Sequence, residues 1–181
     1  MAINSLATHP RQSALDYNRR RLNTRSRDGV NLASLEMPIG LKNAWVAALR
    51  GGAPNEFQYV QGKSRLCNVN LADGTPVSWC CLGVVCDLTK KGYFDGSGVF
   101  HYKDGPDAPN GERIGVTAFP SYHRYTEIFG LRHVVPELRG ADEEKKVIAA
   151  LYTHLSSAND TQVPWADIAD WIEENIFGYR G

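Results

Sequence analysis

Tryptophan, cationic and amide side chains recur around two segments of this chain. Large aromatic rings beside convergent cations suit a stacked, negatively charged ligand such as a nucleotide. We therefore predict a ligand site, with the candidate residues Trp45, Arg50, Gln61, Lys63, Arg65, Trp79, Asp160 and Trp165. Trp45 or Trp79 would stack on the ligand, and Arg50, Lys63 and Arg65 would pair with its phosphates. The alternative is that the tryptophans belong to the core and the cations coat its rim, which is the commoner arrangement.

The cysteines are the next residues that could carry chemistry. They are Cys67, Cys80, Cys81 and Cys86. Cys80 and Cys81 are adjacent, which disfavours a bridge between them, and the run from Trp79 to Cys86 is apolar throughout. We predict buried free thiols that pack as small hydrophobes. Burial would raise the pKa of the Cys81 thiol, which argues against a nucleophile there.

The sequence contains neither the spacing of a zinc site nor a complete phosphate-binding loop. Zinc ligands need short, ordered spacing, and the chain has neither a C-x2-C pair nor an H-x3-H pair. A nucleophilic Cys81 would also need a neighbouring base, and His101 or His123 could serve only if the tertiary fold brought the imidazole close to the sulfur. Gly62-Lys63-Ser64 resembles the end of a phosphate loop, but the glycine required five residues earlier is Phe57. We predict no metal and no cofactor.

Carboxylates are grouped near the C-terminal end of the chain. Asp142-Glu143-Glu144 suits the positive end of a helix dipole. Asp167, Asp170, Glu173 and Glu174 alternate with apolar residues, as on the wet side of an amphipathic helix. We interpret all of them as solvated, with general acid–base work or Mg²⁺ binding as the alternative.

Size and composition predict a single domain without a membrane span. The chain has 181 residues, 43% of them apolar, and a formal net charge of zero. That charge gives no indication of nucleic acid or an anionic membrane as partner. No stretch approaches the roughly 18 apolar residues of a membrane helix. The first residues lack a secretory pattern, so we expect the protein to act in the cytoplasm.

Residues 1–38 differ in character from residues 39–181. They are polar, and they carry a basic cluster of Arg19, Arg20, Arg21, Arg25 and Arg27. We predict a polar, basic N-terminal arm followed by one globular domain. The arm could hold RNA or DNA, but a solvated arm is favoured because only Tyr17 could serve as a stacking platform.

The first half of the domain predicts a helix, a hairpin and a second helix. Apolar residues recur at helical spacing from Leu41 and stop before Gly51-Gly52. Strand-like residues follow at 57–60 and 63–71, and an Asp-Gly turn then leads into 75–79. For 80–91 we predict a buried helix with Gly92 as its C-cap.

The second half predicts strands and then helices. Residues 99–102 and 113–116 would pair around a long polar loop, and a short helix would run from Pro120 to Phe129. A helix capped by Asp142 would run to about Ser156, where Asn159-Asp160 breaks it, and Pro164 would open the last helix. We predict an α+β fold: a small antiparallel sheet or hairpins packed with about five helices, the last third being helical.

Five groups of residues along the chain form a recognisable pattern: Trp45–Gly51, Gln61-Gly62 with Leu66, Cys80–Leu88, Leu155 with Asn159-Asp160, and Trp165 with Ile168–Glu173. Together they resemble a family of small, uncharacterised bacteriophage and prophage proteins. The resemblance covers about 41–176 with gaps; the arm before 38 and the stretch 92–118 look atypical. It implies a phage origin and action in the cytoplasm of an infected bacterium. It supplies no catalytic residues.

Three functions follow as hypotheses. The first is a non-enzymatic phage accessory protein that counters bacterial immunity, by sequestering a nucleotide-derived signal or by blocking a host defence protein. The second is a small hydrolase or phosphodiesterase-like enzyme acting on a nucleotide through a Cys/His or Asp/Glu site. The third is nucleic-acid binding through the arginine arm, which we rank last. A homodimer remains open, and no membrane partner is expected.

Overall fold

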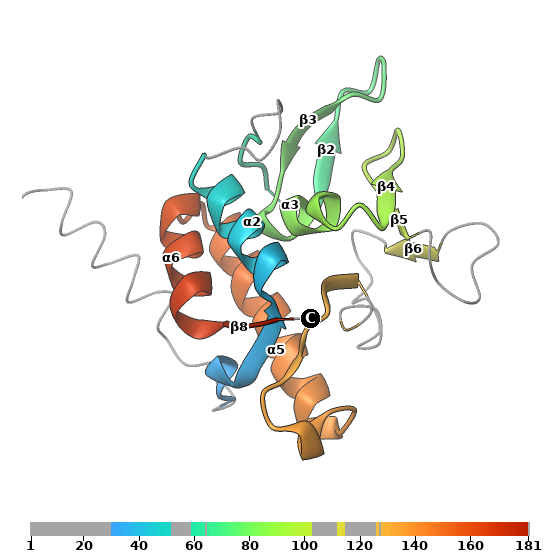
Figure 1. Cartoon of the computed structure of the whole chain (residues 1–181). Coiled ribbons are helices and arrows are strands. Elements are labelled where there is room, and N and C mark those ends of the chain that lie inside the picture. Colours follow the sequence, from blue (N-terminus) through green and yellow to red (C-terminus); the bar gives the residue numbers. More distant parts are fainter. Residues whose placement is uncertain are drawn as a thin grey trace, which may run out of the picture.

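The computed structural model describes residues 30–51, 59–63, 65–102, 112–114, 126 and 128–180. The predicted α+β class is confirmed (Figure 1). The described residues contain four α-helices, where the sequence indicated about five. The helices are α2 (Ile39–Leu49), α3 (Cys81–Leu88), α5 (Asp142–Asp160) and α6 (Trp165–Asn175), with short 3-10 turns η1 (Leu32–Ser34) and η2 (Pro136–Leu138). The strands are β1 (Leu35–Pro38), β2 (Cys67–Val69), β3 (Pro76–Trp79), β4 (Gly92–Phe94), β5 (Phe100–Tyr102), β6 (Glu112–Ile114), β7 (Arg132–His133) and β8 (Phe177–Tyr179).

The four helices form the body of the molecule, and the apolar core lies among them. The apolar positions predicted for α5 and α6 are buried, including Leu155, Ile168 and Ile172, none of which has measurable exposure. α2 ends at Leu49 and Gly51 follows with φ +81°, as the glycine signal predicted. The buried Lys42 of α2 donates to the carbonyl oxygens of Glu173 and Ile176, so it caps the C-terminal end of α6. Lys42 therefore helps to fix how α2 packs against α6, a helix far away in the sequence.

Part of the predicted N-terminal arm belongs to the folded body. β1 is the middle strand of a three-stranded sheet, antiparallel to β7 and parallel to β8. Its Leu35 and Met37 side chains are completely buried. The boundary at residue 38 is therefore wrong, because alternate apolar residues of this strand face the core. Residues 1–29, with the arginine cluster, lie outside the described residues.

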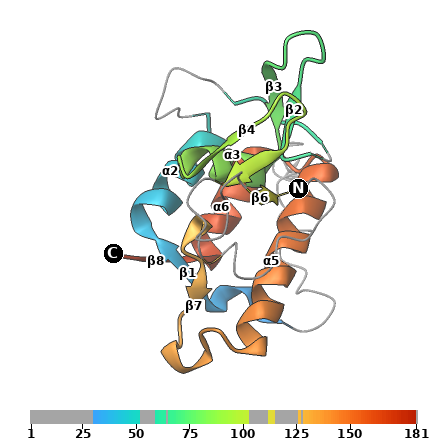
Figure 2. The same ribbon diagram turned by 90° about the vertical axis from the view of Figure 1, so that its right-hand side faces the viewer.

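The predicted hairpin is confirmed as β2 and β3, which pair antiparallel with Cys67 opposite Trp79. Gly74 takes φ +71° in the turn between them. Figures 1 and 2 show this hairpin projecting from the helical body. Residues 60–62 run parallel to the end of β3, where the Trp79 amide donates to the Val60 carbonyl and the Gly62 amide donates to the Trp79 carbonyl. Of the strand expected at 57–60, residues 57 and 58 lie outside the described part.

A second three-stranded sheet has the order β4-β5-β6, with both pairs antiparallel. The predicted pairing of β5 with β6 is confirmed, whereas β4 was not predicted. The predicted role of Gly92 as a C-cap is wrong, because Gly92 lies in β4 opposite Tyr102. Lys90 instead takes the left-handed conformation after α3, with φ 56°. Gly92 is needed for another reason: a Cβ there would lie 2.3 Å from the His101 carbonyl oxygen.

The helix ends in the last third differ from the sequence predictions. α5 continues through Asn159-Asp160, and Ala141 rather than Asp142 is its N-cap. Glu144 was interpreted as solvated, but it is buried and accepts from the backbone amides of His133 and Gly140, each at 2.5 Å. The predicted last helix is confirmed as α6. Of the helix expected at 120–129, residues 120–125 and 127 lie outside the described part.

The turn between β4 and β5 is organised by one carboxylate. Asp95 accepts from the Ser97 amide and hydroxyl, from the Val99 amide, and from His101 Nε2 at 2.7 Å. Tyr93 stacks on the His101 ring with 5.1 Å between ring centres. Burial acts to raise the pKa of Asp95, but the bonds from Ser97, His101 and Val99 outweigh it and hold that pKa below its usual range.

We expect this turn to contribute acid-sensitive stability. Because the folded-state pKa of Asp95 lies below the unfolded-state value of about 3.9, its contribution is present above that value and is lost as the pH falls further. Asp95→Asn should lower the melting temperature at pH 7, and its deficit should shrink below about pH 4. Thermal unfolding followed by circular dichroism between pH 7 and pH 2.5 measures this. Glu137→Gln, an exposed acidic control, should follow wild type, and a deficit independent of pH would contradict the assignment.

Candidate functional site

Asn159 joins four separate segments of the chain in the interior. Its Oδ1 accepts from the Cys81 amide at 3.1 Å and from Trp165 Nε1 at 3.0 Å, and its Nδ2 donates to the Gly62 carbonyl at 2.8 Å. The side chain has no measurable exposure. A buried amide with its oxygen and nitrogen both paired is stabilising and specifies one arrangement.

Trp45 and Trp165, two of the predicted site residues, are core residues. They are 2% and 8% exposed. Trp45 Nε1 donates to the Cys81 carbonyl at 2.8 Å, and Trp165 Nε1 is held by Asn159. With faces buried and N–H groups satisfied, neither ring is available for a ligand to stack on. Their assignment to a ligand site is therefore corrected to a packing role.

The Cys-Cys-Leu-Gly segment at the start of α3 packs very closely against the chain before β2. Cys80 is the N-cap of α3, and its sulfur accepts from the Gly83 amide at 3.3 Å. The Cys80 amide donates to the Leu66 carbonyl at 3.1 Å. A Cβ on Gly83 would lie 1.7 Å from that carbonyl oxygen. Only a residue without a side chain lets α3 approach the chain before β2 this closely.

All four cysteines are free and buried, as predicted. Burial is the main cause that raises the pKa of the Cys67 thiol to about 12 and that of Cys80 to about 11. Burial likewise raises the pKa of Cys81 and of Cys86 well above the ordinary value. A nucleophilic cysteine needs an accessible thiolate, so these sulfurs serve packing. The Cys81 version of the hydrolase hypothesis has no support in this geometry.

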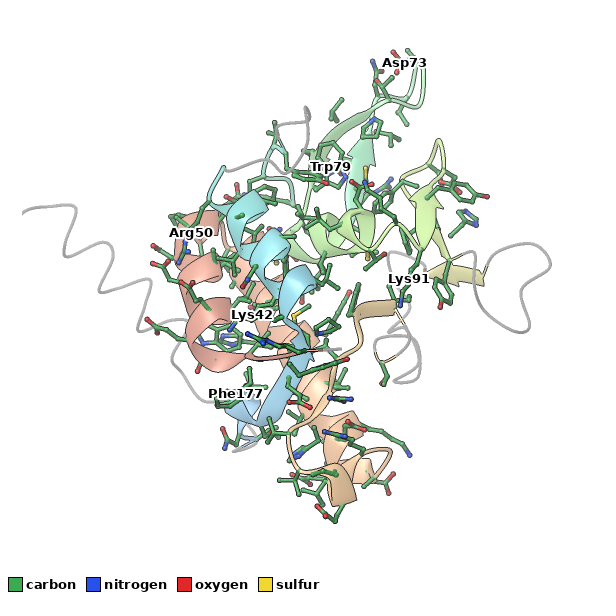
Figure 3. All side chains as sticks on the ribbon, viewed as in Figure 1. Lys42, Arg50, Asp73, Trp79, Lys91 and Phe177 are labelled. Carbon is green, nitrogen blue, oxygen red and sulfur yellow. The ribbon has the colours of Figure 1, made fainter. Side chains whose placement is uncertain are left out.

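Arg50 is turned toward α6 and away from the other predicted cations. Its guanidinium Nη2 lies 2.5 Å from Asp170 Oδ1 and 2.6 Å from Glu173 Oε2. Figure 3 shows Arg50 beside α6, whereas Trp79 lies at the base of the hairpin. The bonds to Glu173 and Asp170 raise the pKa of Arg50, and the bond with Arg50 lowers the pKa of Glu173. Arg50 is thus engaged at the surface of α2 and α6, and it does not join the other cations.

Five residues remain together at the base of the hairpin, and we call them the hairpin-base group: Tyr59, Gln61, Lys63, Arg65 and Trp79. Tyr59 meets Trp79 edge-on, with ring centres 5.2 Å apart. Gln61 lies beside Trp79 through a parallel bridge, and its Nε2 donates to the Val163 carbonyl at 2.9 Å. Lys63 and Arg65 are exposed and have no ion-pair partner among the residues that the structure describes. The group therefore combines aromatic surface with two cations that form no ion pair with any described residue.

The indole nitrogen of Trp79 is the atom of this group that most favours a ligand site. This Nε1 is buried and has no hydrogen-bond partner among the described residues, and Trp79 as a whole is partly exposed. Buried N–H groups are nearly always paired, so an unpaired donor calls for a physical explanation, and a further group that binds here would supply one. Tyr59 was not predicted for this site. Its hydroxyl donates to Asp87 Oδ2 at 2.6 Å, which holds the Tyr59 ring against Trp79.

Asp160 is exposed and follows Asn159, whose amide reaches the Gly62 carbonyl. It therefore lies near the residues that precede Lys63 along the chain. The structure thus brings Gln61, Lys63, Arg65, Trp79 and Asp160 to one region of the hairpin base. It places Trp45 and Trp165 beneath that region and Arg50 elsewhere.

A small apolar cavity in the described part of the chain is too small for a nucleotide, and no metal-type cluster occurs among the described residues. A cavity of about 10 Å³ lies between Met37, Trp45, Leu82 and Tyr152. It is apolar and at most the size of one water molecule, so it cannot hold a nucleotide. No group of three His, Cys, Asp or Glu side chains capable of holding a metal occurs among the described residues. Across the same residues, no helix has the length and apolar character required to cross a membrane.

Comparison with known proteins adds no assignment to this α+β chain. No protein-family model matches it, and no curated protein or solved structure is significantly similar to it.

Proposed function

We propose that this protein is a phage accessory factor that counters bacterial immunity by binding a negatively charged, nucleotide-derived signal at the hairpin-base group. The observation that carries the proposal is the pair of exposed cations, Lys63 and Arg65, in the segment between Gln61 and Cys67, both of which pair with Trp79. The indole N–H of Trp79 also has no hydrogen-bond partner among the described residues. Charge-assisted bonds to phosphate and an aromatic edge are the usual means of holding a nucleotide. The phage context comes from the sequence resemblance.

The buried residues of the segments that resemble phage proteins favour a hairpin base that binds a ligand over one that converts it. Asn159, Trp165, Cys81 and Gly83 interlock inside the body. They provide a rigid support for the hairpin base, whose polar side chains then remain for recognition. Pre-organised side chains lose less entropy on binding, so a rigid base raises the affinity for a small ligand.

Isothermal titration against a panel of cyclic and ADP-ribose nucleotides tests the proposal. The Lys63→Gln/Arg65→Gln double variant should bind the active nucleotide at least about 100-fold more weakly, because each charge-assisted bond contributes about 1.5–3 kcal/mol. Lys146→Gln, which removes an exposed cation from α5, is the matched control and should bind like wild type. Equal affinity of the double variant and wild type would exclude this site. The absence of heat with every nucleotide would leave only the version in which a host defence protein is blocked.

Recovery of the bound nucleotide separates sequestration from the enzymatic alternative. We expect the intact nucleotide to be released when the complex is denatured, as measured by mass spectrometry. A converted product, with conversion lost in Asp160→Ala, would favour the hydrolase hypothesis, since Asp160 is the exposed carboxylate near the hairpin base. Conversion that continues in Asp160→Ala would place catalysis outside this region.

A further inference from the structure

The tip of the β2–β3 hairpin, residues 70–75, is a rigid turn. The Asn70 amide donates to the Thr75 carbonyl at 2.8 Å, and the Gly74 amide donates to the Asn70 carbonyl at 2.7 Å. Two side chains reinforce the backbone: Asn70 Oδ1 accepts from the Ala72 amide, and Asp73 Oδ1 accepts from the amide and hydroxyl of Thr75. The shape of the tip is therefore fixed before any partner arrives.

This rigid turn presents one large apolar side chain to solvent. Leu71 is 92% exposed, the highest value among the large apolar side chains of the described residues. The hairpin projects from the body in two perpendicular views, and Asp73 marks its far end (Figures 1, 2 and 3). A single exposed leucine is unremarkable on a flat surface. At the end of a rigid projection it has the geometry of an anchor that enters a partner's pocket.

The charge of the hairpin defines the partner further. Asp73 is the only ionisable acidic or basic residue from Asn68 to Trp79. The hydrogen bonds from the hydroxyl and amide of Thr75 lower the pKa of Asp73, so its carboxylate stays ionised at neutral pH. An apolar tip beside one fixed negative charge is complementary to an apolar pocket with a cationic rim.

Strand addition is the other common way for a hairpin to bind a protein, and this hairpin is poorly suited to it. Pro76 begins β3 and lacks the N–H that an added strand would require. The Trp79 amide and carbonyl are already bonded to residues 60 and 62. On β2, Gly98 lies against the Cys67 carbonyl, where a Cβ would come within 2.2 Å of the oxygen. Recognition is therefore left to the side chains of the tip.

We propose that the tip docks into a partner protein whose surface offers an apolar pocket rimmed by lysine or arginine. Leu71 fills the pocket, and Asp73 pairs with the rim. This surface is separate from the hairpin-base group, so nucleotide binding and partner docking are independent properties. A nucleotide-binding result, positive or negative, leaves this proposal standing.

Site-specific photo-crosslinking followed by titration tests the docking proposal. A benzophenone amino acid at position 71, in the full chain produced in a bacterium, should form an adduct with one protein. The same group at position 77 is the control, because Val77 lies on the same hairpin and is 50% exposed. The captured protein is then identified, purified and titrated with unmodified variants. Leu71→Ser should weaken its Kd at least about 30-fold, whereas Val77→Ser should change it less than threefold.

The proposed role of the Asp73 carboxylate is tested separately, through the Kd and its dependence on salt concentration. Asp73→Asn should weaken the Kd several-fold and flatten its dependence on salt concentration, because a charge pair at the rim is screened by ions. Equal adducts at positions 71 and 77, no adduct at either, or full affinity of Leu71→Ser would overturn the proposal. Binding to phosphatidylcholine/phosphatidylglycerol vesicles that is lost in Leu71→Ser would overturn it as well, because the tip would then be a membrane element.

Discussion

Asn159→Leu should lower the free energy of unfolding by about 3–5 kcal/mol, or prevent folding. Leucine is similar in size to asparagine but cannot hydrogen-bond, so the Cys81 amide, the Trp165 indole N–H and the Gly62 carbonyl would all lose a partner. Each buried group left unpaired costs about 1–3 kcal/mol. A domain of this kind is stable by only about 5–15 kcal/mol, so the expected loss is a large share of the total.

Urea unfolding followed by tryptophan fluorescence measures this effect. Asn43→Leu provides the matched control, because Asn43 is an exposed residue of α2. The same chemical change there should alter the free energy of unfolding by less than about 0.5 kcal/mol. If Asn159→Leu were also within 1 kcal/mol of wild type, the interior bonds of Asn159 would not be holding the four segments together.

Gly83→Ala is expected to be the most damaging glycine-to-alanine substitution in the described part of the chain. The new Cβ would lie 1.7 Å from the Leu66 carbonyl oxygen, a closer approach than at any other described glycine. Neither side of this contact is a flexible side chain, so α3 and the chain before β2 would have to separate. Forced overpacking of this kind costs about 3 kcal/mol or more.

The same substitution at a second helical glycine gives a control of opposite sign. A Cβ on Gly40 would meet nothing within 4 Å. Gly40→Ala should therefore stabilise the protein by up to about 1 kcal/mol, because alanine is the better helix former. Thermal unfolding of both variants decides the matter: melting temperatures that move in the same direction would show that the close contact at Gly83 does not determine the packing of α3.

These two substitutions address the segments on which the predicted resemblance to phage proteins rests. Gly62, Cys81, Gly83, Asn159 and Trp165 are joined by interior hydrogen bonds or by close backbone contact. A motif made of such interior residues describes a scaffold, and it does not locate a reaction. The proposals for the hairpin base and the hairpin tip therefore rest mainly on Lys63, Arg65, Trp79, Leu71 and Asp73, which lie outside those segments.

The sequence alone determined those elements whose signals are local. The apolar spacing of α2 and α6, the Asp-Gly turn of the hairpin and the uniformly apolar run of α3 each lie within about a dozen residues. Hydrophobic periodicity and turn chemistry are local properties, so these elements and the burial of the thiols could be predicted.

The tertiary structure decided what depends on partners far apart in the chain. β1 pairs with strands near residues 132 and 177, so the sequence analysis mistook it for part of an arm. Asn159 looked like a helix breaker because the groups that satisfy it come from residues 62, 81 and 165. Arg50 was assigned to a ligand, but Asp170 and Glu173 lie within reach only after α2 packs on α6. A polar side chain's role depends on which groups the folded chain brings to it, and no local pattern contains that information.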